Sequence, residues 1–144
     1  MHFITLVLVP MEHEDDPLLE MVRLLWPWTA DGGHRGIECD FWQVGGRFSG
    51  WLDPEYDPRE DPANQEGGEL ILPYPWISHA EDVLPTRLAV ERLDGRLPAV
   101  IITPDGEWYG EPWLPPDATK WSPVFDEVLH QHLDTLTVVV DCHR

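Results

Sequence analysis

Residues 2–9 read HFITLVLV, and residues 136–140, near the other end of the chain, read LTVVV. Both stretches are rich in β-branched residues and nearly continuous in their apolarity. Such runs favour strands, and a strand without alternating polar residues is typical of a sheet that is covered on both faces. We therefore expect these two stretches to be the central strands of one sheet.

Three segments between and beside these strands carry helix signals. Asp16 and Pro17 supply a cap and a first-turn proline, and apolar residues then recur at helical spacing until Pro27. Ser78, followed by Glu81, has the pattern of a capping box. The predicted helices span residues 17–26, 79–84 and 122–133.

Glycine and proline turns divide the rest of the chain into short strands. A glycine pair separates two of them, as in a hairpin or a bulged strand. A Pro-Asp-Gly run at residues 104–106 suits the tight turn of a second hairpin. The predicted strands span residues 37–44, 47–52, 69–72, 97–103 and 107–109.

This order of elements predicts an α+β fold, an open mixed or antiparallel sheet with two or three helices packed on one face. A ferredoxin-like topology is the leading expectation. The chain has 144 residues, no internal repeat and no linker between two apolar cores, so residues 1–144 are expected to be one domain. Residues 53–69 combine prolines with acidic residues and are predicted to be an exposed excursion.

The chain carries 27 acidic and 9 basic residues, a formal net charge of −18. This field repels phosphate backbones and anionic lipids, so direct binding to nucleic acid or to a membrane is not expected. The two cysteines, Cys39 and Cys142, exclude a disulfide framework, although one bridge between them would need only Cα atoms within about 7 Å. We expect a reduced, cytoplasmic protein.

The end of the last predicted strand carries Asp141, Cys142 and His143, and the preceding helix adds His130. Carboxylate, thiolate and imidazole are zinc ligands, and they are also the groups that accompany a nucleophilic cysteine. Neighbouring strand residues point to opposite faces, which argues against a simple version of either site. No cofactor is predicted, and zinc at these four residues is the alternative. The catalytic candidates are Cys142, His143 and Asp141.

Residues 41–51, FWQVGGRFSGW, form the densest aromatic and glycine segment. Glycines let a ligand approach the backbone, and an arginine beside them can hold a carboxylate or phosphate. The alternative is a tight turn whose aromatic neighbours pack in the core. The candidate binding residues are Arg47, Gly45, Gly46, Trp42 and Trp108.

Three segments carry a resemblance: DFWQVGGRFSG at residues 40–50, TPDGEW at residues 103–108 and VDCH at residues 140–143. They resemble an uncharacterised family of small proteins from actinobacterial phages and related bacterial genomes, with GGR[WF]xG, TPDGxW and C-terminal DCH segments. Some similar proteins carry cysteine pairs before the glycine segment, where this chain has only Cys39. The resemblance implies a phage or mobile-element origin and brings no known activity.

The leading hypothesis is a small acidic, non-enzymatic binding protein that occupies a basic site on a protein partner. Residues 53–69 and nearby tryptophans would supply electrostatic steering and aromatic anchors. One alternative is a metal- or cysteine-dependent enzyme that uses the terminal Asp-Cys-His. Another is a module that binds a small anion at Gly45, Gly46 and Arg47. The sequence sets neither the partner nor the oligomeric state.

Overall fold

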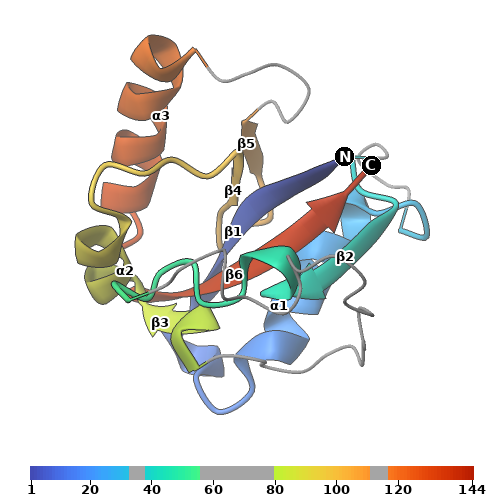
Figure 1. Cartoon of the computed structure of the whole chain (residues 1–144). Coiled ribbons are helices and arrows are strands. Elements are labelled where there is room, and N and C mark those ends of the chain that lie inside the picture. Colours follow the sequence, from blue (N-terminus) through green and yellow to red (C-terminus); the bar gives the residue numbers. More distant parts are fainter. Residues whose placement is uncertain (33–37, 56–79, 111–116) are drawn as a thin grey trace.

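A computed structural model of the chain describes residues 1–32, 38–55, 80–110 and 117–144. Within these residues a six-stranded mixed sheet runs in the order β2-β6-β1-β4-β5, and β3 also pairs with β6 (Figure 1). The strands are β1 (His2–Pro10), β2 (Phe41–Val44), β3 (Val83–Pro85), β4 (Val100–Ile102), β5 (Trp108–Gly110) and β6 (Thr135–His143). The helices are α1 (Pro17–Leu25), α2 (Thr86–Leu93) and α3 (Ala118–His130).

The sheet is built around β1 and β6. They pair antiparallel along their whole length, from His2 opposite His143 to Pro10 opposite Thr135. On the other side of β1, β4 runs parallel to it, and β5 completes an antiparallel hairpin with β4. The two predicted central strands and the predicted hairpin are therefore confirmed.

The α+β fold with an open mixed sheet is also confirmed. The finer expectation of a ferredoxin-like topology stays a prediction. The described elements include more strands and helices than the β-α-β-β-α-β unit, and β1 and β4 form a parallel pair within the sheet.

Alternate residues of the central strands build two separate cores. One core contains Val7 and Val138 and is covered by α1. The other contains Leu6 and Val139 and is covered by residues of α2 and α3. The prediction that the helices pack on one face is therefore wrong. Because β1 and β6 are apolar on both faces, each face needs its own cover.

The segment after the glycine pair is not a strand. β2 begins only at Phe41 and ends at Val44, and the chain then turns through a 3-10 helix, Gly46–Phe48. Both glycines have positive φ, 68° at Gly45 and 55° at Gly46, and this conformation takes the chain out of the sheet. The predicted strand over residues 47–52 is therefore wrong.

The helix predicted over residues 17–26 is confirmed as α1, and the other two predicted helices differ from the structure. The predicted helix over residues 79–84 is a 3-10 turn, Ala80–Asp82, followed directly by β3, and the pattern missed α2 altogether. α3 begins at Ala118, before the predicted start, because Asp117 accepts a hydrogen bond from the Thr119 N–H and caps it. The predicted strand over residues 69–72 and most of the excursion over residues 53–69 lie outside the described residues.

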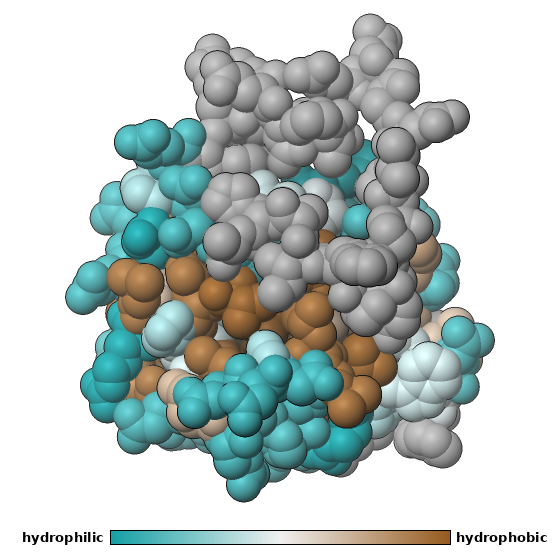
Figure 2. Space-filling view, turned by 90° about the horizontal axis from the view of Figure 1, so that it is seen from below, coloured by the Kyte–Doolittle hydropathy of each residue, from teal (hydrophilic) through white to brown (hydrophobic). Residues whose placement is uncertain are grey.

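The surface of the acidic chain is not evenly hydrophilic. Figure 2 shows the face that lies below in Figure 1, where apolar residues gather in the middle and hydrophilic residues lie beside and below them. Among the described residues, no helix combines the length and the apolarity needed to cross a membrane.

Candidate functional site

The last three residues of β6 do not converge on one point. Cys142 is buried in the core on the α1 side, whereas Asp141 and His143 alternate with it and point to the other face. The structure therefore brings Asp141 and His143 together and separates Cys142 from both.

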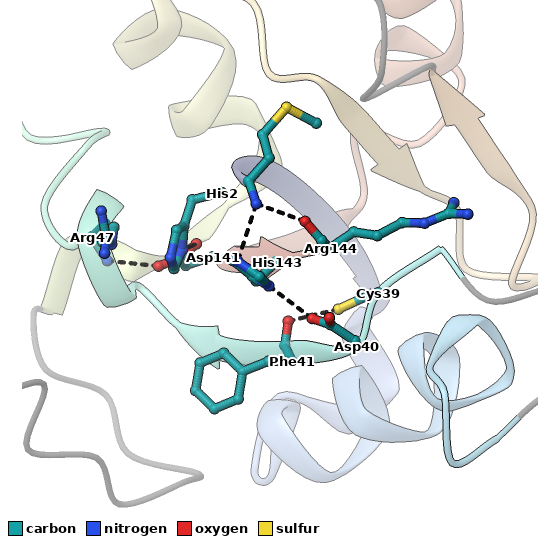
Figure 3. A network of polar contacts seen from close by, with 9 residues as sticks. His2, Cys39, Asp40, Phe41, Arg47, Asp141, His143 and Arg144 are labelled. Carbon is teal, nitrogen blue, oxygen red and sulfur yellow. Dashed lines mark hydrogen bonds and ion pairs between the residues drawn. The ribbon is translucent and has the colours of Figure 1, made fainter.

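Two aspartate-histidine pairs meet at this end of the sheet (Figure 3). His2 Nδ1 lies 2.8 Å from Asp141 Oδ1, and His143 Nδ1 lies 2.8 Å from Asp40 Oδ1. The two imidazole rings contact edge to face, with centroids 4.8 Å apart. The hydrogen bond from His143 holds the pKa of Asp40 below its usual value. Each carboxylate thus orients one ring and sets the nitrogen that carries its proton.

Asp141 is buried and accepts a second hydrogen bond. The backbone N–H of Arg47 donates to Asp141 Oδ2 over 2.9 Å, while the Arg47 side chain is exposed. One carboxylate therefore joins β6 to His2 and to the turn that follows β2. This is the role of the first residue of the terminal Asp-Cys-His.

A second buried aspartate, Asp82, holds the other end of the same turn. It lies directly before β3, where the Gly50 N–H donates to its Oδ1 over 2.7 Å and the Ser49 hydroxyl donates to its Oδ2 over 3.0 Å. We call residues 45–50 with Asp82 and Asp141 the aspartate clasp. It fills the position between β2 and β3, which both pair with β6.

The glycine pair exists because the two carboxylates approach the backbone closely. A Cβ on Gly45 would lie 2.3 Å from Asp82 Oδ2, and a Cβ on Gly46 would lie 2.6 Å from Asp141 Oδ2. Glycines are therefore required at both positions on steric grounds as well as by their positive φ. The Arg47 and Gly50 N–H groups of this turn donate to the protein's own aspartates, and the Gly45 N–H donates to the Val139 carbonyl oxygen over 2.8 Å.

Cys39 and Cys142 are both free thiols in the core. The Cys39 thiol donates to the Phe41 carbonyl oxygen over 2.8 Å. Burial raises the pKa of the Cys142 thiol well above its usual range. A nucleophilic cysteine needs an accessible site and a lowered pKa, and Cys142 has neither.

His130 lies far from the other metal candidates. It ends α3, where its Nδ1 lies 2.7 Å from the Asp126 carbonyl oxygen, and β6 then spans roughly 25 Å between Thr135 and His143. In the part of the chain that the structure describes, no group of three or more His, Cys, Asp or Glu side chains is placed to hold a metal ion. The zinc site stays a prediction.

The two candidate tryptophans lie against the α1-side core, away from the clasp. The Trp108 ring contacts Phe3 and Trp28, with centroids 6.3 Å and 5.4 Å apart, and Trp28 Nε1 donates to the Gly106 carbonyl over 3.1 Å. Trp42 is partly buried against the same core. The predicted binding set is thus divided between the clasp, with Gly45, Gly46 and Arg47, and this core, with Trp42 and Trp108.

A pocket of about 300 Å³ lies beside the edge strand β2, and we call it the edge pocket. Three aromatic residues and two aspartates line it, and no basic residue among those that the structure describes does. The sequence predicts Trp42 as a binding candidate, but no sequence signal joins it to these acids. The edge pocket is lined by Trp26, Thr29, Asp31, Asp40, Phe41, Trp42 and Gln43.

Local hydrogen bonds hold the loop wall of the edge pocket. The Thr29 hydroxyl donates to the Trp26 carbonyl over 2.8 Å and accepts from the Gly32 N–H over 3.1 Å. A Cβ on Gly32 would lie 1.7 Å from the Trp26 carbonyl oxygen, so the loop closes tightly here. Trp26 and Asp31 are thereby positioned by a short, hydrogen-bonded turn.

Comparison of the chain with models of known families, with curated proteins and with solved structures finds no match. The resemblance to the phage family therefore stays a prediction.

Proposed function

We propose that the protein is a small acidic, non-enzymatic binding protein, of phage or mobile-element type, that occupies a basic site on a protein partner. The observation that carries the proposal is that most of the few basic side chains form ion pairs with the chain's own acids. The chain has a formal net charge of −18, and five of its nine basic side chains are paired with its own acids in the described structure. The pairs are Arg23 with Glu20, Arg87 with Asp134, Arg92 with Glu81, Lys120 with Asp117, and Arg144 with Glu38.

Such a surface acts on a basic partner in two stages. The unbalanced charge attracts the partner over a distance set by the salt concentration, about 10 Å at 0.1 M. Exposed aromatic residues then supply the contact area that holds the complex, and Trp26 and Phe41 are exposed beside the carboxylates of the edge pocket.

The competing hypothesis of a cysteine-dependent enzyme has less support. Cys142 is fully buried, faces away from Asp141 and His143, and has a raised pKa. These properties are typical of a structural thiol.

The test is a partner capture followed by kinetics. The tag-free protein captures proteins from a host lysate at about 0.05 M salt, and the association rate of the purified pair is then measured up to about 0.5 M salt. We expect a basic partner and a rate that falls by at least about tenfold over this range. An unrelated acidic protein of similar charge serves as the control bait. A partner without a basic surface, or a rate that salt leaves unchanged, would contradict the proposal.

A further inference from the structure

We infer that the edge pocket binds the guanidinium group of an arginine side chain on the partner, an inference that rests on the proposed function. The pocket lies at the outer edge of the sheet, where β2 pairs only with β6 among the described strands. It has about the volume that small ligands occupy, and it is concave, aromatic and acidic at once.

The aromatic wall suits a flat cation on an apolar stem. Trp26 is 42% exposed and Phe41 is 40% exposed, although side chains of this size are usually covered. An arginine places its methylene stem along such rings and stacks its planar head on their faces. A guanidinium is also less strongly hydrated than an ammonium, so it enters an aromatic pocket at lower cost than lysine does.

The two carboxylates supply the charge and the acceptors. Asp31 and Asp40 are both exposed at the pocket, and among the described residues no lysine or arginine lines it. The hydrogen bond from His143 uses Oδ1 of Asp40. The second oxygen of Asp40 and both oxygens of Asp31 can accept the N–H groups of a guanidinium, in the geometry that makes arginine-carboxylate pairs strong.

Gln43 is another residue that lines the pocket, and it carries an acceptor without a described donor. Its amide oxygen is shielded from solvent and has no hydrogen-bond donor among the described residues. A buried acceptor without a partner costs free energy that a ligand N–H can recover once the amide turns toward it. A guanidinium has five N–H groups, enough for both carboxylates and for this oxygen, whereas a quaternary ammonium has none.

The experiment titrates the intact protein with Nα-acetyl-arginine amide and follows the indole N–H signals of Trp26 and Trp42 by NMR. The matched probe is Nα-acetyl-citrulline amide, which has nearly the same shape without the charge. We expect saturable shifts with the arginine probe, at least about tenfold weaker binding of the lysine analogue, and no saturation with citrulline. The variant Asp31→Asn should weaken arginine binding at least about fivefold, and Asp31→Asn with Asp40→Asn should abolish it.

Control variants separate the pocket from general charge and from damage to the fold. Asp126→Asn makes the same charge change on exposed α3 and should bind arginine as the parent does. Each variant is checked by its amide spectrum. Equal binding of arginine and citrulline, or unchanged binding by the double variant, would overturn the inference. Because this titration needs no partner, its failure leaves the salt test of the proposed function standing, and the reverse also holds.

Discussion

Two pairs of aspartates in this molecule carry the same charge and differ in what they bind. Asp82 and Asp141, in the aspartate clasp, are buried and accept hydrogen bonds from the turn that joins β2 to the rest of the sheet edge. Asp31 and Asp40, at the edge pocket, are exposed, and only the second of them has a protein donor among the bonds described above. The clasp aspartates are part of the fold, and the pocket aspartates remain open to a ligand.

The comparison shows that the aspartates of one acidic chain can belong to two different kinds of site. A carboxylate surrounded by backbone N–H groups has its charge compensated within the fold, and it contributes stability. A carboxylate beside exposed aromatic rings contributes to recognition instead. The same substitution made at a clasp aspartate and at a pocket aspartate therefore separates the contribution to stability from the contribution to binding.

The largest effect is expected from Asp141→Ala. The substitution removes the acceptor of the Arg47 N–H and of His2, and it should lower the free energy of unfolding by about 3 kcal/mol. Asp141→Asn keeps one acceptor oxygen and should lose less. Urea unfolding measures both, with Asp31→Ala as the matched control. An equal loss of stability in Asp31→Ala would end the distinction between the two pairs.

Gly46→Ala should have the next largest effect, a loss of about 2 kcal/mol in the free energy of unfolding. The added Cβ would lie too close to Asp141, and the backbone at this position has a positive φ that alanine disfavours. Gly95→Ala is the control, since Gly95 also has a positive φ but nothing lies within 4 Å of its Cβ. That variant should lose only about 1 kcal/mol. The difference between the two unfolding curves measures the close approach of the clasp, and identical losses would show that the approach costs nothing.

Glu20 is an intermediate case, a buried carboxylate whose partner is the exposed side chain of Arg23. The hydrogen bond from Arg23, Nε to Oε2 at 2.8 Å, lowers the pKa of Glu20. A lowered pKa in the folded state stabilises the protein above the unfolded pKa, about 4.3, and this contribution is lost as the pH falls through the folded value. Glu20→Gln should therefore lose less than about 1 kcal/mol at pH 7 and match the parent in strong acid. Unfolding measured across this pH range is the check, and a deficit that persists in acid would point to packing instead of charge.

The smallest effect on stability is expected from Asp31→Asn combined with Asp40→Asn. Both side chains are exposed and the substitution weakens only the hydrogen bond between Asp40 and His143, so the urea midpoint should fall only slightly while binding of the arginine probe is lost. A large fall in the midpoint would place these aspartates with the clasp.

The sequence predicted the parts of the fold that depend on local patterns. The apolar runs at residues 2–9 and 136–140 identified the central strands, and the alternation at the end of the second run separated Cys142 from Asp141 and His143. The sequence predicted a turn at the glycine pair, but it did not predict that two aspartates approach the backbone there. Asp82 lies more than 30 residues beyond Gly50, and no local period joins them.

The edge pocket was beyond sequence reasoning for the same reason. Trp26 follows α1 and Phe41 begins β2, so these two residues line one pocket only because the fold brings the end of α1 beside β2. Propensity and spacing describe neighbours within about a dozen residues, whereas this site depends on which strand lies at the sheet edge.

The pairing of β1 with β6 has a consequence for how the chain acquires its structure during synthesis. The ribosome releases β1 first and residues 135–143 last among the described elements, yet each is the other's neighbour along its full length. Until that final strand emerges, β4 offers β1 only a short parallel partner, and neither apolar face can close. From the synthesis of β1 until residues 135–143 emerge, the nascent chain therefore carries an unpaired, β-branched edge, which is the condition under which strands pair with copies of themselves.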